Sequence, residues 1–155
     1  MKLLVMSDSH GSKNSISKIV DSNLDAQIII HLGDGENDME YVPFLNEHAD
    51  IIAVRGNCDI SSMLPVDCVR YIEGHMLYCT HGHVQQVKQG VTEIIKTAGK
   101  YNADIVLYGH THAPVNKCEN GMRLFNPGSV KQGFYGVVNI NDAGAVFEHR
   151  LLETE

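Results

Sequence analysis

Apolar and polar positions in the first third of the chain predict two strands joined by a helix. Residues 2–6 and 26–32 are short apolar runs rich in β-branched side chains, and each ends in a polar cluster of glycine, aspartate or histidine. Between them, apolar residues recur at helical spacing behind Asn14 or Ser15 as an N-cap; they are Ile16, Ile19, Val20 and Leu24. A strand, a helix and a strand in this order indicate a parallel pair.

Both kinds of pattern continue along the rest of the chain. The predicted elements are, in order, a poorer helix at 38–48 broken at Pro43, a strand at 50–55, a hairpin of strands 66–72 and 75–80, a helix at 87–101 and a strand at 104–108. Beyond them, turn signals at Asn120-Gly121, Pro127-Gly128 and 142–144 separate short strands, which predicts antiparallel sheet. The fold class is therefore α/β.

Length and composition favour one small domain. The chain has 155 residues, of which 43% are hydrophobic, so residues 1–155 are expected to fold around one core. The sequence contains neither the roughly eighteen unbroken apolar residues of a membrane span nor a signal peptide with its cleavage site. We therefore expect a cytoplasmic protein without a membrane partner. The four cysteines form no CxxC pair, which favours reduced, mostly buried thiols.

The charge of the chain limits its partners. The formal net charge is −7, and lysine and arginine are scattered singly, so no basic stripe is present to follow a nucleic-acid backbone. Long nucleic acid is therefore not an expected partner. A small anionic substrate would need a local source of positive charge, which bound metal ions provide.

Clusters of oxygen and imidazole donors follow the inferred strands, at the strand ends where α/β folds place ligands. The donors are Asp8, His10, Asp34, Asn57, His81, His110 and His112. Any one of them alone is better explained as a structural histidine or a capping aspartate. Five such clusters in sequence order, each behind an apolar run, instead favour a metal site.

The donor types restrict the metal. Carboxylate, amide oxygen and imidazole suit Mn²⁺, with Ni²⁺, Fe²⁺ or Zn²⁺ as alternatives, and no thiolate is expected among the clusters. Two divalent ions would carry +4 against −2 from Asp8 and Asp34, which leaves +2. The site of an acidic protein would then attract anions.

Five segments resemble the motifs of the calcineurin-like metallophosphoesterases. They are SDSHG at 7–11, GDGE at 33–36, GNCD at 56–59, THGH at 80–83 and GHTH at 109–112. The small size, the cysteine in GNCD and NPGS at 126–129 are most similar to the compact YfcE-type phosphodiesterases of bacteria and archaea. The resemblance implies a four-layer sandwich of two facing mixed β-sheets flanked by α-helices.

The resemblance also implies the ligands of two metal ions. One ion would be held by Asp8, His10, Asp34 and His112, and the other by Asp34, Asn57, His81 and His110, with Asp34 as the bridge. The expected function is hydrolysis of small phosphodiesters by a hydroxide held between the ions, without a phosphoenzyme intermediate. Asn57 counts as catalytic as well as metal-binding.

The general acid is the part of the site where this chain departs from the superfamily pattern. The wider superfamily has GNHD, whereas this chain has Cys58, and a buried thiol is a poor acid for an alkoxide. The role is then absent or supplied elsewhere. His83 is the candidate, and a structural role for it is an equal alternative.

Two other functions compete with this prediction. A non-catalytic scaffold of the same fold, as in the small subunit of retromer, typically lacks part of the ligand set, whereas this chain retains all seven donors. A phosphomonoesterase, or a nuclease that acts on short pieces, would use the same two ions, because the pocket walls decide between such substrates.

Several further residues have alternative interpretations. For Asp59, the alternatives are that it orients a neighbour or that it caps a helix. For Glu36 and Asn37, the alternatives are contact with the substrate and a plain turn beside Gly35. Surface or core roles are expected for His31, His48, His75 and His149. A homo-oligomer through the C-terminal strands or core packing within one chain explains Phe134, Tyr135 and Phe147 equally well.

Overall fold

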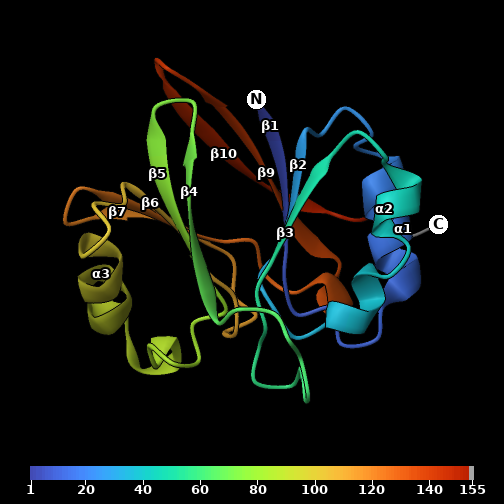
Figure 1. Ribbon diagram of the computed structural model, residues 1–155, viewed down its shortest axis with the longest axis horizontal. Helices are drawn as coiled ribbons and strands as arrows, with labels where there is room; N and C mark the ends of the chain where they lie inside the picture. Colours follow the sequence, from blue (N-terminus) through green and yellow to red (C-terminus); the bar gives the residue numbers. More distant parts are fainter. Residues whose placement is uncertain (154–155) are drawn as a thin grey trace.

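Two mixed five-stranded sheets face each other in the computed structural model, which describes residues 1–153 (Figure 1). The first sheet has the order β10-β9-β1-β2-β3, with β1 Lys2–Met6, β2 Ile28–His31, β3 Asp50–Ala53, β9 Phe134–Asn141 and β10 Gly144–Leu151. The second sheet has the order β4-β5-β6-β8-β7, with β4 Asp67–Ile72, β5 His75–Thr80, β6 Ile105–Leu107, β7 Val115–Glu119 and β8 Met122–Asn126.

Short helices cover the outer faces of both sheets. The α-helices are α1 Lys13–Asp21, α2 Val42–Leu45 and α3 Thr92–Gly99, and the 3₁₀ helices are η1 Glu36–Met39, η2 Val87–Gln89 and η3 Val130–Gln132. In Figure 1, α1 and α2 lie outside the first sheet and α3 lies outside the second. Helix, sheet, sheet and helix make four layers, as the family resemblance implied.

Side-chain alternation along each strand builds the core between these layers. In β1, Leu3 and Val5 point into the inter-sheet cluster, where Leu77 and Phe125 of the second sheet meet them. Leu4 and the rest of the opposite face pack under α1 instead. A third cluster lies between the second sheet and α3. Because both faces of each sheet are covered, the central strands are apolar throughout.

The predicted βαβ unit is confirmed, and its details differ. β1 pairs with β2 in parallel, and β2 pairs with β3 in parallel. However, α1 begins at Lys13 behind Ser12, so the predicted N-caps at Asn14 and Ser15 are wrong. Leu24 also lies outside the helix, where 57% of it is exposed, because the chain turns toward β2 after Asp21.

Two predicted helices are shorter than expected. Pro43 does not break a helix but lies in the first turn of α2. Backbone N–H groups in a first turn have no partner within the helix, so proline costs no hydrogen bond there. The segment 87–101 is divided into η2 and α3 at Gly90. The φ of Gly90 is 137°, which no helix accommodates.

The hairpin predictions are confirmed, and the C-terminal sheet prediction is only partly correct. Glu73 and Gly74 turn with φ values of 48° and 86°, and Asn120-Gly121 joins β7 to β8 in the same manner. However, β8 pairs with β6 in parallel, so the C-terminal third is not purely antiparallel. Pro127-Gly128 carries the chain from the second sheet back to the first rather than closing a hairpin.

The structure also tests the predictions for the cysteines and for the aromatic residues of the C-terminal strands. All four cysteines are free, but only Cys79 is buried, so the prediction of mostly buried thiols is wrong. Tyr135 is buried beneath the first sheet and Phe147 packs against the inter-sheet core, so contacts within one chain account for both. Within residues 1–153, no helix has the length and apolarity needed to cross a membrane.

A close approach between the sheets supplies a test of this packing. A Cβ added to Gly136 of β9 would lie 2.7 Å from Cζ of the buried Phe125 ring. We expect Gly136→Ala to lower the free energy of unfolding by about 1–3 kcal/mol, because the ring has no room to move. Urea denaturation measures the change.

Gly99→Ala is the matched control, because a Cβ there would meet only Met122 Cε at 3.6 Å. Alanine is also favoured over glycine in a helix, so this variant should be neutral or slightly stabilising. Equal destabilisation by the two substitutions would show that the sheets do not interlock at Gly136.

Candidate metal centre

Seven donor side chains from both sheets meet beyond the ends of parallel strands. Those from the first sheet follow β1, β2 and β3 and are Asp8, His10, Asp34 and Asn57. Those from the second sheet follow β5 and β6 and are His81, His110 and His112. The inter-sheet core holds the two strand edges side by side, which brings residues distant in sequence together.

The backbone is bent sharply at most of these positions. Left-handed φ values occur at five non-glycine donors, which are Asp8 (54°), His10 (43°), Asp34 (59°), His110 (68°) and His112 (60°). Such a conformation costs on the order of 1–3 kcal/mol for each residue and concentrates at functional sites. Each of these five residues lies in the loop that follows β1, β2 or β6.

One group of donors contains Asp8, His10 and His112. Nε2 of His10 lies 3.2 Å from Nε2 of His112 and 3.7 Å from Oδ1 of Asp8. Nε2 of His112 also lies 3.2 Å from the same aspartate oxygen. These three atoms face one another around one point.

A second group contains Asp34, Asn57, His81 and His110. Nε2 of His81 lies at its centre, 3.2 Å from Oδ2 of Asp34, 3.1 Å from Oδ1 of Asn57 and 3.2 Å from Nδ1 of His110. The same Oδ2 of Asp34 lies 3.8 Å from Nε2 of His10 in the first group. Oδ1 of Asp8 likewise lies 3.9 Å from Nε2 of His81, so the two groups adjoin at both aspartates.

The unmet hydrogen-bonding capacity of these donors fits cations. Oδ1 of Asp8 is buried and has no hydrogen-bond partner among the described residues, while its Oδ2 accepts from Ser7 Oγ at 2.7 Å and His110 N at 3.0 Å. Unpaired buried carboxylate oxygens are costly unless a cation compensates them. A cation beside Oδ1 of Asp8 would compensate its charge and would also lie next to the imidazole nitrogens of His10 and His112.

Lowered pKa values keep Asp34 and His110 in the deprotonated forms that bind metal ions. Burial acts to raise the pKa of Asp34, but hydrogen bonds from His81 and from the Cys58 N–H outweigh it and hold that pKa well below its ordinary range. Burial and the neighbouring His81 lower the pKa of His110 to about 4. An ionised carboxylate and a neutral imidazole are the forms that bind metals.

Asp59 fixes the loop that carries Asp34. Its Oδ2 accepts from the N–H groups of Asp34 at 2.8 Å and Gly56 at 2.7 Å, and its Oδ1 accepts from Gly35 at 2.9 Å and Glu36 at 3.0 Å. Of the two interpretations of Asp59, the structure supports the orienting one. The carboxylate ties the turn after β2 to the turn after β3.

The two turns also touch through a glycine. A Cβ at Gly56 would lie 2.7 Å from Cγ of Asp34, so only glycine leaves room for this carboxylate. In addition, Cys58 N–H donates to Oδ1 of Asp34 at 2.7 Å. On the other sheet, Nδ1 of His81 lies 2.6 Å from the Leu32 carbonyl, which orients its Nε2 toward the site.

A buried network of Ser9, His31 and Asp38 supports the first donor group, and the sequence did not single it out. Nδ1 of His31 accepts from Gly33 N–H at 3.2 Å, so Nε2 carries the proton and faces Ser9 Oγ at 3.1 Å. Ser9 then donates to Asp38 at 2.7 Å, and Asp38 accepts from Gly11 N–H at 2.8 Å. The sequence signal that could have identified His31 was its position, since it is the last residue of the strand that precedes Asp34.

The NPGS segment at 126–129 also buttresses the site. Nδ2 of Asn126 donates to the Gly109 carbonyl at 3.0 Å and to Thr111 Oγ1 at 3.1 Å, which holds the loop of His110 and His112. Ser129 Oγ donates to the Asp8 carbonyl at 2.8 Å. This segment therefore links the loops of the two sheets.

Other residues of interest divide between the site and the scaffold. His83 borders the site, with its ring centroid 5.4 Å from that of His81, and its buried Nδ1 has no hydrogen-bond partner in the described part of the chain. His75 bonds to Asp104 and His149 stacks on Phe125, both as scaffold, and His48 is exposed.

The environment of Cys58 differs from the predicted one. Cys58 is exposed rather than buried, and its sulfur lies within 4.8 Å of donor atoms of His10 and Asp34. The expectation that no thiol lies among the clusters is therefore wrong.

Comparisons with known proteins identify the relatives of this chain. A family model described as the calcineurin-like phosphoesterase superfamily domain matches residues 1–142. Phosphodiesterase YfcE from Escherichia coli strain K12 is 33% identical over 153 residues, which cover 84% of this chain and 79% of the relative. A solved structure from Streptococcus pneumoniae TIGR4, described as a conserved uncharacterized protein and predicted phosphoesterase, has a TM-score of 0.82 at 27% identity and covers 97% of this chain and 88% of its own.

A third relative is similar in fold only. Wild-type Vps29 from Entamoeba histolytica, solved in complex with Zn²⁺, has a TM-score of 0.74 at 19% identity and covers 97% of this chain and 99% of its own.

Burial of His31 predicts how stability depends on pH. Burial lowers its pKa to about 4, whereas an unfolded histidine titrates near 6.5. Between these values the unfolded chain binds a proton that the folded chain does not, so stability falls as the pH drops from 6.5 to 4. This contribution should reach on the order of 3 kcal/mol, and His31→Gln should remove it.

Urea unfolding in a chelator at pH 4 to 7 measures the effect as the difference between wild type and variant. The exposed His48 provides the control substitution, His48→Gln, which should leave the pH dependence unchanged. A wild-type curve parallel to that of His31→Gln would contradict the buried, neutral state of His31.

Proposed function

Because the chain belongs to the calcineurin-like phosphoesterase superfamily, we propose that it uses two divalent metal ions to hydrolyse small phosphodiesters. The family is one of divalent-metal-dependent hydrolases, and this chain has relatives named as phosphodiesterases, YfcE and MJ0936. The single observation that carries the proposal is the meeting of seven donors in two groups around Asp34.

Each group would hold one ion. Asp8, His10, Asp34 and His112 would form the first site, and Asp34, Asn57, His81 and His110 the second, with Asp34 as the shared ligand. The distances support this division, since Asp8 groups with His10 and His112, Asp34 groups with His81 and His110, and Oδ2 of Asp34 also lies 3.8 Å from Nε2 of His10. Mn²⁺ is the first candidate, and Ni²⁺, Fe²⁺ or Zn²⁺ have compatible donor preferences.

The ions would supply the charge that this acidic protein lacks. When bound, they would lower the pKa of a water molecule and neutralise negative charge on the phosphoryl oxygens. The protein contributes fixed geometry: Asp59 holds the loop of Asp34, and the Leu32 carbonyl orients His81. Such preorganisation reduces the rearrangement needed at the moment of reaction.

His83 is the proposed proton donor to the leaving group. Its ring lies beside His81 and His110, with centroids 5.4 and 6.2 Å away, and its half-buried position lets it reach the mouth of the site. No hydrogen bond to the described residues fixes its Nδ1. Cys58, although exposed, is a weak donor for this purpose.

A non-catalytic scaffold is the second candidate, favoured by the likeness in fold to Vps29. Such a protein would have no need for five strained donors or for the unpaired Asp8 oxygen. Turnover separates the two candidates. Comparing activated diesters with activated monoesters in the same assay separates a phosphodiesterase from a phosphomonoesterase.

The shared ligand gives the most direct test. With Mn²⁺, the purified protein should bind two ions per chain and hydrolyse bis(4-nitrophenyl) phosphate. Asp34→Asn should lower kcat/KM by roughly 100-fold or more and reduce the metal content, because both ions lose a carboxylate. Asp50→Asn, an exposed position at the far end of β3, is the control and should retain both properties.

Absence of bound ions and of turnover with manganese, nickel, iron and zinc would reject the enzyme and favour the scaffold. One bound ion with full activity would reject the binuclear site alone.

Leaving-group dependence tests His83. His83→Ala should lower kcat more on diesters of poor leaving groups, such as alkyl alcohols, than on 4-nitrophenyl diesters, because only the former need a proton from the protein. We expect a difference of about 100-fold. His48→Ala serves as control, and an equal loss on both substrate types would remove His83 as the acid.

A further inference from the structure

Two hollows adjoin the donor site and share a wall. The inner hollow, of 250 Å³, includes His10 and Asp34 in its lining. The outer hollow, of 280 Å³, extends to residues 60–62 in the segment that follows β3. Four residues line both hollows, namely Glu36, Asn37, Cys58 and Asp59. The two hollows therefore adjoin each other at Cys58 and its three neighbours in the lining.

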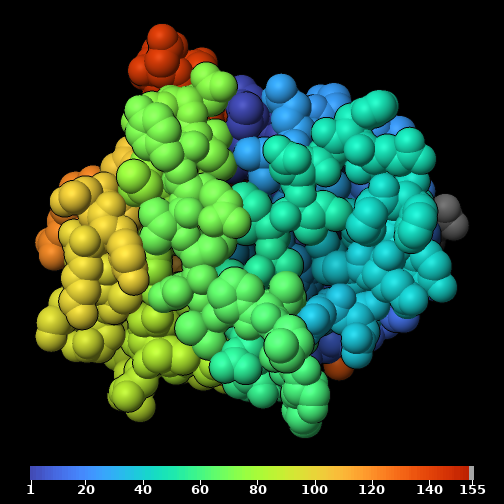
Figure 2. All heavy atoms as spheres, in the orientation of Figure 1, coloured from blue at the N-terminus to red at the C-terminus, as the bar shows by residue number. Residues whose placement is uncertain are grey.

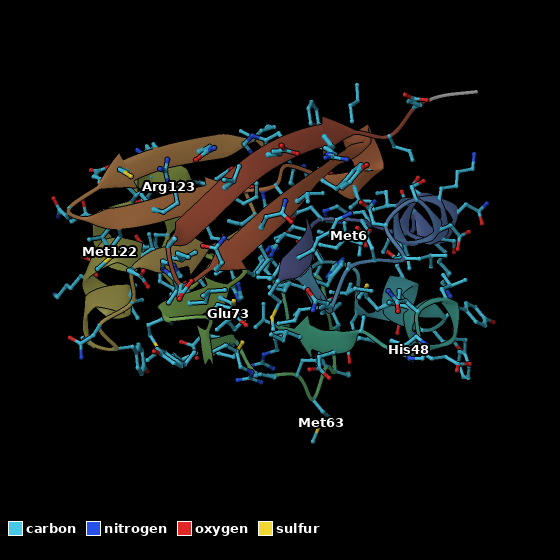
Figure 3. All side chains as sticks on the ribbon, turned by 90° about the horizontal axis from the view of Figure 1, so that it is seen from above. Met6, His48, Met63, Glu73, Met122 and Arg123 are labelled. Atoms are coloured by element: carbon cyan, nitrogen blue, oxygen red, sulfur yellow. The ribbon has the colours of Figure 1, made fainter. Side chains whose placement is uncertain are left out.

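The outer hollow is built on the chain segment after β3. Figure 2 shows this segment protruding at the lower edge of the face in view. Met63, which is 95% exposed, points away from the molecule in Figure 3, so it leaves the hollow free. Ile60 is the one aliphatic residue in the lining, and it is 88% exposed.

The lining of both hollows is polar and lacks positive charge. Neither lining contains a lysine or an arginine. Both carboxylate oxygens of Asp59 are occupied by backbone N–H groups, and Ser62 Oγ accepts from Leu64 N–H at 3.0 Å. The side chains of Glu36, Asn37 and Ser61 make no hydrogen bond within residues 1–153, and of these three Glu36 is the charged group that can meet a ligand.

Glu36 is held at a fixed place beside the donor site. Its backbone N–H donates to Asp59 at 3.0 Å, and the same carboxylate holds the N–H of Asp34. The Asp59 carboxylate therefore fixes the position of Glu36 relative to Asp34. A carboxylate accepts hydrogen bonds from hydroxyl groups and repels anions, with no neighbouring cation in the lining to offset the repulsion.

We propose that the outer hollow binds one ester arm of the diester and that Glu36 selects an uncharged, hydroxyl-bearing arm of the size of a small polyol. This inference rests on the proposed phosphodiesterase function and adds a substrate class to it. The phosphate lies at the donor site, while the arm passes Cys58 and donates hydrogen bonds to Glu36. An arm that carries a carboxylate or a second phosphate is disfavoured.

Two larger hollows do not compete with this assignment. They measure 760 and 690 Å³ and are lined by residues of α1, η3 and the chain end at 151–153. Neither lining contains a donor residue. Of these four hollows, it is therefore the two smaller ones that a phosphate ester at the donor site would reach.

A matched pair of substrates tests the proposal. Both are 4-nitrophenyl phosphodiesters; the second alcohol is glycerol in one and glyceric acid in the other, so the arms differ by a hydroxymethyl group against a carboxylate. The Mn²⁺-loaded wild type should favour the glycerol diester by about tenfold in kcat/KM, the size of one charge repulsion near the surface. Glu36→Gln should remove most of this preference through a gain on the glycerate diester.

Two further variants make the test specific to charge in the hollow. Asn37→Asp adds a carboxylate to the same lining and should increase the preference, and this opposite change cannot come from a folding defect. Glu47→Gln removes an exposed carboxylate outside both linings and should leave the preference unchanged.

The outcomes distinguish this inference from the function on which it rests. If the wild type hydrolyses bis(4-nitrophenyl) phosphate but treats the two diesters alike, or if Glu36→Gln keeps the wild-type preference, the role of Glu36 is overturned. If the wild type hydrolyses no diester with any of the four metals, the proposed function itself is overturned.

Discussion

The structure depends on the fixed position of one carboxylate, that of Asp34. One of its oxygens accepts from Cys58 N–H at 2.7 Å, while the other faces His81 at 3.2 Å and His10 at 3.8 Å. It thereby connects the two sheets as well as the two donor groups. A buried carboxylate remains ionised only where hydrogen bonds or cations compensate its charge.

The scaffold around this carboxylate is polar, whereas the scaffold that supports the strands is apolar. Asp59 gathers four backbone N–H groups, and Ser9, His31 and Asp38 form a second network beneath the first donor group. Behind them, the inter-sheet cluster keeps the strand ends together. The apolar core thus sets the distance between the sheets, and the polar networks set the direction of each donor.

The same arrangement joins the proposed chemistry to the proposed selectivity. A protein of net charge −7 would attract a phosphate only where metal ions reverse the local charge. The lining beyond Cys58 keeps the acidic character of the protein, because it includes Glu36 and no lysine or arginine. Attraction at the donor site and repulsion beyond it would together favour a diester with a single negative charge.

Periodicity and the residue types that follow each strand were enough to predict the strands, the parallel βαβ order and the seven side chains that meet beyond the strand ends. The sequence misjudged the ends of α1, the division at Gly90 and the parallel pairing of β8, which depend on the path of the chain between elements and on the strand order of the sheet. The roles of His31 and Asp59 and the exposure of Cys58 were likewise decided only by tertiary structure. The physical reason is that a donor type is written in one residue, whereas its hydrogen-bond partners and its exposure come from segments that only folding brings together.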